Sequence, residues 1–176
     1  MSDSNNQKFN HLKIHTQYSI CEGAIKIDKL KDFCKENKIQ CLGLSDTSNL
    51  CGALEFAENI SKVGTQPIIG TQINFKYEDT TGLLPLIALN EKGYKRIINL
   101  SSKSYLENDN LSDPHLDIKE LLIETEGVII LSGTIHGLFG KLFEKGRLEE
   151  ISKLYQAISK KFNDRFYLEI QRHGDQ

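Results

Sequence analysis

Short apolar runs alternate along this chain with longer segments in which apolar residues recur every three or four positions. Runs of the first kind are typical of buried strands, and the second spacing is typical of helices with one solvent-facing side. The apolar runs lie at 41–46, 67–75, 83–89 and 128–133, and the helical patterns lie at 27–37, 53–60, 93–105, 118–125 and 147–161. This alternation predicts an α/β domain with a parallel sheet, whose site lies at the carboxyl ends of its strands.

An expected first strand, at about residues 10–15, carries unusual side chains on its polar face. Side chains alternate along a strand, so His11, Lys13 and His15 share one face. Such groups belong in a polar pocket, because a buried charge needs a partner. The alternative is that the two histidines, four positions apart, are structural or surface residues on one helix face. Two histidines without a third ligand do not define a metal site.

Composition limits the class of protein. The chain has 176 residues, a net charge of −2 and a pI of about 6.2, which suits one domain and argues against a basic nucleic-acid surface. Its four cysteines have no C-x-x-C spacing and indicate free thiols in the cytoplasm. No phosphate loop, serine nucleophile elbow or membrane span is found. Residues 1–8 are expected to be a disordered tail, and 9–176 one domain.

Five motifs follow one another along the chain. They are His-Leu-Lys-Ile-His-Thr-Gln-Tyr-Ser (11–19), Leu-Ser-Asp-Thr-Ser-Asn-Leu-Cys-Gly-Ala-Leu-Glu-Phe (44–56), Pro-Ile-Ile-Gly (67–70), Ala-Leu-Asn-Glu-Lys-Gly-Tyr (88–94) and Tyr-Leu-Glu-Ile-Gln-Arg-His-Gly (167–174). In this order they resemble the PHP (polymerase and histidinol phosphatase) domain family. More narrowly, they resemble the N-terminal region of the alpha subunit of bacterial DNA polymerase III. The resemblance runs from about Phe9 to Gly174.

The resemblance implies a parallel-strand, distorted TIM-like barrel of seven strands. At most six strands can be counted in this sequence, and no helix follows the last one. The barrel is therefore expected to be incomplete in these 176 residues, with an open seam. The resemblance also implies that the chain is the N-terminal portion of a much longer polymerase polypeptide.

In metal-binding members of that family, the metal ligands come from the strand ends and the loops after them. The resemblance places the matching positions of this chain at Lys13, His15, Glu22, Asp46, Thr47, Gln72, Thr134, Gln171 and His173, with Leu83 as a looser match. A cluster of divalent metals needs carboxylates and neutral imidazoles at roughly 2.0–2.2 Å. Threonine, leucine and the glutamine amide are poor replacements, and an ammonium has no lone pair and repels a cation.

These positions are therefore expected to form a vestigial metal pocket without metal and without catalytic residues. The weak remaining ligand candidates are His15, Glu22 and His173. Lys13 is expected to pair with Glu22 or Asp46, where it supplies the missing positive charge. For Asp46, capping of the following helix is an equally good alternative. The histidines of the later loops receive no role.

The function that the resemblance implies is support rather than hydrolysis. The complete polypeptide of such a chain is a DNA-directed DNA polymerase, whose polymerase region uses Mg²⁺, and no cofactor is expected in the present residues. The domain is expected to brace the polymerase and to dock the proofreading exonuclease subunit, with other replisome subunits and DNA as further partners and no membrane. Two alternatives remain: a metal-dependent PHP phosphoesterase or 3′–5′ exonuclease, and an interaction module unrelated to replication.

Overall fold

The computed structural model describes residues 9–108 and 113–171, and their six strands form one open sheet. The strand order is β1-β2-β3-β5-β6, with β4 beside β2. The strands are β1 (Cys41–Thr47), β2 (Gln66–Tyr77), β3 (Thr80–Ala88), β4 (Leu116–Asp117), β5 (Val128–Leu131) and β6 (Phe166–Tyr167). Within the described ranges β1 and β6 do not pair, so the sheet does not close. The α/β class and the open seam are confirmed.

The sheet is mixed, because one strand runs against the others. β1 and β2, β2 and β4, and β5 and β6 pair in parallel, whereas β3 is antiparallel to both β2 and β5. The expectation of parallel pairing was therefore wrong for the strand at 83–89. The reason is a two-residue turn of Glu78 and Asp79, after which Thr80 pairs with Tyr77. Such a turn joins only antiparallel strands, since a parallel pair needs a crossover of a dozen or more residues.

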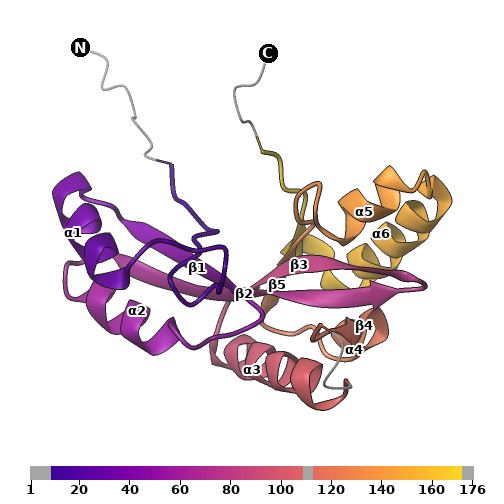
Figure 1. Ribbon diagram of the computed structural model, residues 1–176, viewed down its shortest axis with the longest axis horizontal. Helices are drawn as coiled ribbons and strands as arrows, with labels where there is room; N and C mark the ends of the chain where they lie inside the picture. Colours follow the sequence, from indigo (N-terminus) through magenta and orange to yellow (C-terminus); the bar gives the residue numbers. More distant parts are fainter. Residues whose placement is uncertain (1–8, 109–112, 172–176) are drawn as a thin grey trace, which may run out of the picture.

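In the described part of the chain, six α-helices cover the sheet (Figure 1). They are α1 (Ile27–Asn37), α2 (Ala53–Ser61), α3 (Glu91–Leu106), α4 (Ile118–Ile123), α5 (Leu138–Glu144) and α6 (Leu148–Phe162), and a 3₁₀ turn (Asn163–Arg165) leads from α6 to β6. In the view of Figure 1, α3 lies below the sheet and α5 and α6 lie above it. Sequence patterning predicts all of these helices except α5, which is short and contains Gly140.

The core consists of two apolar clusters along the sheet. One cluster is formed by buried residues of β1 and of the helices α1 and α2 that pack on it: Ile27, Leu30, Cys34, Leu42, Leu44, Ala53, Phe56 and Ile60. The larger cluster joins β2, β3 and β5 to α3, α5 and α6, with members such as Phe75, Leu86, Ile97, Leu142 and Phe162. Burial of each such side chain stabilises the fold by about 1.5–3 kcal/mol, and this packing fixes the strand ends that carry the polar residues.

The two outer segments of the chain, residues 10–15 and the residues after β6, differ from the regular strands expected for them. The segment at 10–15 lies beside β1 but makes only one isolated bridge, from Ile14 to Leu44. The last strand ends at Tyr167 instead of continuing toward residue 173. In Figure 1 the two segments rise on the same side of the sheet. The expected tail at 1–8 lies outside the described residues. No helix in the described ranges is both long and apolar enough to cross a membrane.

Candidate functional site: a pocket between the two outer segments

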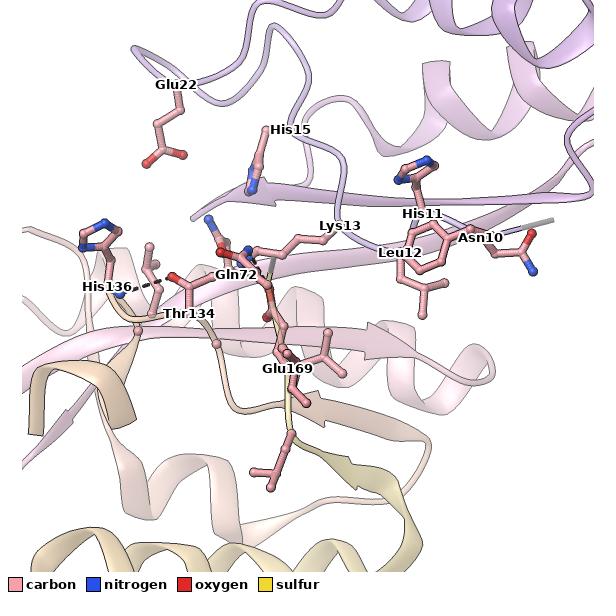
Figure 2. A pocket seen from close by; sticks show the side chains of 18 residues that line it. Asn10, His11, Leu12, Lys13, His15, Glu22, Gln72, Thr134, His136 and Glu169 are labelled. Atoms are coloured by element: carbon pink, nitrogen blue, oxygen red, sulfur yellow. Dashed lines mark hydrogen bonds and ion pairs between the residues drawn. The ribbon is translucent and has the colours of Figure 1, made fainter. Parts of the chain in front are cut away.

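A pocket of about 690 Å³ lies between the N-terminal segment and the segment after β6. Figure 2 shows His15 and Glu22 on one side of it and Thr134 and His136 on the other. The positions expected from the sequence that line it are Lys13, His15, Glu22, Gln72, Thr134 and Gln171. Thr47 is hydrogen-bonded to Glu22 and Gln72, whereas Asp46 bonds to Thr16 and Ser19 in the loop beside the pocket. His173 lies outside the described residues.

An ion pair between Lys13 and Glu169 crosses the pocket. The Lys13 Nζ donates to Glu169 Oε1 at 3.2 Å, and the side chains are only 19% and 13% exposed. The Nε2 of Gln171 donates to the same oxygen at 3.0 Å. The other carboxylate oxygen, Oε2, is buried without a hydrogen-bond partner. The expected pairing of Lys13 with Glu22 or Asp46 is therefore wrong, because Glu169 occupies that role.

Asp46 is a buried structural carboxylate at the end of β1. Its Oδ1 accepts from the Thr16 amide at 2.6 Å and from Ser19 Oγ at 2.7 Å, and its Oδ2 accepts from Thr16 Oγ1 at 2.7 Å. Both alternatives considered for Asp46 are therefore wrong. It does not pair with Lys13, and the residue before α2 is Gly52, with no side-chain cap. The function of Asp46 is to hold the loop after the first segment on β1.

His15 is half-buried and presents a neutral imidazole to the pocket. Burial lowers its pKa, as does the nearby Lys13 ammonium, while Glu22, Asp46 and Glu169 pull the pKa of His15 upward more weakly. Its Nδ1 lies 3.5 Å from Ser19 Oγ. That hydroxyl gives its only proton to Asp46, so it accepts from His15 Nδ1–H. The Nε2 lone pair of His15 therefore remains available on the pocket side.

Three further side chains form a hydrogen-bonded row across the pocket. Gln72 Nε2 donates to Thr47 Oγ1 at 2.9 Å, and the Thr47 hydroxyl donates to the exposed Glu22 carboxylate. Gln72 itself is only 6% exposed. Thr47, which matches a family histidine, thus connects an amide to a carboxylate and provides no imidazole nitrogen. The row holds Glu22 by hydrogen bonding alone.

On the opposite wall, the loop after β5 contributes Thr134 and His136. Thr134 Oγ1 accepts from the His136 amide at 3.2 Å, so this hydroxyl shapes its own loop. Sequence reasoning missed His136 and Glu169 as pocket residues. Nothing in the sequence near His136 signals its position. Glu169 could have been found, because it precedes Gln171 by two residues and therefore shares its face in an extended segment.

Residues 11–173 match the model of the PHP domain family. The chain belongs to the PHP domain family. Over 182 aligned positions, this PHP domain is 38% identical to a DNA polymerase III subunit alpha from Caulobacter vibrioides, covering 99% of this chain and 16% of that protein. It is 36% identical to the subunit from Borreliella burgdorferi, covering 95% of this chain and 15% of that protein.

The PHP domain therefore spans about one sixth of the length of the curated relatives that it matches. Among solved structures, it is similar to a candidate metal-dependent phosphoesterase from Bifidobacterium adolescentis, with a TM-score of 0.41 and 17% identity. That match covers 88% of this chain and 57% of the other.

The donor set that residues 9–108 and 113–171 provide does not fit a divalent-metal cluster. Within the described ranges, no three His, Cys, Asp or Glu side chains are grouped so that they could hold an ion. His15 and Glu22 are the candidate ligands that reach the pocket, and Lys13 places an ammonium beside them. An ammonium has no lone pair and raises the electrostatic energy of a nearby cation. Among the described residues, the pocket therefore offers hydrogen bonds and one ion pair.

Proposed function

We propose that this chain is the N-terminal PHP domain of a DNA polymerase III alpha subunit and acts there as a non-catalytic support. Its role is to brace the polymerase body and to dock the proofreading exonuclease subunit within the cytoplasmic replisome. Mg²⁺ and DNA bind to the polymerase region of the whole protein. The relatives named DNA polymerase III subunit alpha support the assignment to the polymerase. The observation that carries the non-catalytic role is the Lys13–Glu169 ion pair in the family's metal pocket.

Hydrolysis of a phosphoester by a metal-dependent enzyme needs a metal-bound water as nucleophile and a cation for the developing charge. Here the side chains at the positions that match the family's metal ligands bond to other protein groups. Thr47 and Gln72 bond each other, and Asp46 accepts three hydrogen bonds from the loop that it anchors. No contact among the described residues of the pocket supports the phosphoesterase and 3′–5′ exonuclease alternative, and the domain leaves proofreading to its partner.

The docking role is tested by size-exclusion chromatography of the chain with the purified proofreading exonuclease subunit. We expect co-elution at equimolar ratio near physiological salt. The whole alpha subunit with and without this domain is the matched comparison, and only the form with the domain should retain the exonuclease. Retention by the form lacking the domain would show that another region provides the docking surface.

The absence of hydrolysis is tested with p-nitrophenyl phosphate and with 3′-labelled single-stranded DNA in Mn²⁺ or Zn²⁺. The control is His15→Ala, which removes an imidazole that a metal-dependent reaction would need. We expect equal background rates for the two proteins. Turnover by the natural sequence that exceeds the rate of His15→Ala would contradict a non-catalytic role.

A further inference from the structure

We propose that the Lys13 ammonium is a covalently tethered replacement for a metal ion, which clasps the two ends of the open sheet through Glu169. This inference depends on the misfit between the pocket and a metal, and it is independent of exonuclease docking. Metal ions connect ligands that come from different strands, because one cation attracts several donors. In this domain, a single side-chain cation makes the connection between the first and last segments.

The first end of the clasp is held on β1 by backbone hydrogen bonds on both sides of Lys13. The Gly43 amide donates to the His11 carbonyl at 2.7 Å, and the Ile14 amide donates to the Gly43 carbonyl at 3.0 Å. Gly43 permits this approach, since a Cβ there would stand 2.5 Å from the Leu12 carbonyl oxygen. Lys13 is therefore fixed to one edge of the sheet.

The second end is held on β5 through Ser132. The Ser132 amide donates to the Tyr167 carbonyl at 2.9 Å, and the Glu169 amide donates to Ser132 Oγ at 2.9 Å. Ser132 is 7% exposed, so these contacts are shielded from water. Glu169 is therefore fixed to the opposite edge of the sheet, two residues beyond Tyr167, where β6 makes its last backbone contact.

Between these edges, the described strands make no backbone pairing, because β1 and β6 are the two ends of the strand order. The Lys13–Glu169 contact spans that gap and joins residues 156 positions apart. Both side chains are mostly buried, so the attraction is screened less by water and salt than that of a surface pair. It therefore links the edges directly across the pocket.

The geometry also shows what the clasp lacks. The Lys13 ammonium donates to Oε1 of Glu169, while Oε2 is buried and has no hydrogen-bond partner in the described structure. A buried acceptor without a donor destabilises the folded state. A guanidinium has parallel donors that match both carboxylate oxygens, whereas an ammonium acts as a point charge. Arginine at position 13 is thus expected to improve the clasp.

The experiment is a double-mutant cycle of Lys13→Met, Glu169→Gln and the double variant, measured by thermal unfolding of the 176-residue chain. We expect each single variant to lower the melting temperature by roughly 4–8 °C, because each leaves one group of the pair without its partner. The double variant should lose less than the sum of the two. The control is Lys92→Met, which breaks the exposed Lys92–Glu126 pair and should shift melting by about 1–2 °C at most. Additive losses in the cycle would overturn the clasp.

Two further variants keep the test decisive if Lys13→Met does not fold. Lys13→Arg should raise the melting temperature, and the exchanged pair Lys13→Glu/Glu169→Lys should melt above Lys13→Glu alone. Hydrogen exchange of the backbone amide at position 169 should quicken about tenfold in Glu169→Gln, as the outer segment loosens. Mn²⁺ and EDTA should leave the melting temperature of the natural sequence unchanged. A lower melting temperature for Lys13→Arg, or a rise with Mn²⁺, would refute the tethered replacement.

Discussion

Asp46 holds Thr16 at two atoms, since its Oδ1 accepts from the Thr16 amide and its Oδ2 accepts from the Thr16 hydroxyl. The carboxylate has no exposed surface, and Ser19 completes its shell. Hydrogen bonds to an ionised, buried acceptor are stronger than those between neutral groups. This contact therefore fixes the loop that carries His15 and Glu22 against the end of β1.

Asp46→Asn should destabilise the domain by about 3 kcal/mol, because the amide replaces one acceptor with a donor that faces donors. Urea unfolding at neutral pH measures the loss, and Asp28→Asn is the matched control. Asp28 is exposed and accepts from the neighbouring Lys29 amide, so its substitution should change stability by less than about 0.5 kcal/mol. Equal effects of the two substitutions would show that burial of Asp46 is not what matters.

The His15 imidazole should titrate below its ordinary pKa of 6.5, since burial and Lys13 disfavour its protonated form. The unfolded chain then binds more protons than the folded chain as the pH falls from about 6.5 through the folded-state pKa. Stability should therefore decrease over that window, and His15→Gln should remove this part of the decrease. Imidazole NMR signals give the pKa directly. Lys13→Met should raise the pKa of His15, and a downward shift would contradict the stated cause.

Asp79 forms a two-pronged contact with the Arg147 guanidinium, which connects the β2–β3 turn to the start of α6. This hydrogen bonding holds the pKa of Asp79 well below its usual 3.8, with a smaller effect of Lys145. A lowered carboxyl pKa contributes stability above the unfolded value, and this contribution is lost as the pH falls through the folded value. Carboxyl NMR titration should show Asp79 ionised at pH 3, whereas in Arg147→Gln it should titrate near its ordinary value.

Gly93 lies in the first turn of α3, directly against the backbone of Gly127. A Cβ at position 93 would stand 1.8 Å from the Gly127 carbonyl oxygen, which is part of the loop before β5. Gly93→Ala should therefore destabilise the domain by about 3 kcal/mol or more in urea unfolding. Gly64→Ala is the control, because that site has open space and a φ of +80°. It should lose only about 1 kcal/mol from backbone strain.

Local patterning predicts most of the helices and buried strands. The apolar positions of α1 at Ile27, Leu30 and Cys34 follow helical spacing, and the observed helix covers the expected range. The direction of β3 was missed because its turn lacks the usual glycine or asparagine, and Glu78 adopts a φ of +53° instead. The short separation between the two expected strands nevertheless indicated an antiparallel pair. The residues between 75 and 83 are too few for the crossover that a parallel pair needs.

The sequence predicted which positions lie in the site, but it did not predict which side chains contact one another there. Family resemblance brought Lys13, His15 and Gln72 to one pocket, where the structure also places them. The partner of Lys13 depends on where the segment after β6 turns, and this follows from tertiary contacts such as that of Ser132. The role of Asp46 depends on the fold of a loop in which Cys21 has a φ of +65°. Spacing alone does not reveal such loop conformations.

The 156-residue separation between Lys13 and Glu169 also has a consequence for synthesis of the protein. Lys13 emerges from the ribosome first, and nearly all of the described chain is synthesised before Glu169 follows. During that interval the edge beside β1 is available to other nascent chains, as is typical of contacts that form late. Slow translation through the α6 region would lengthen this period and increase the demand for chaperones.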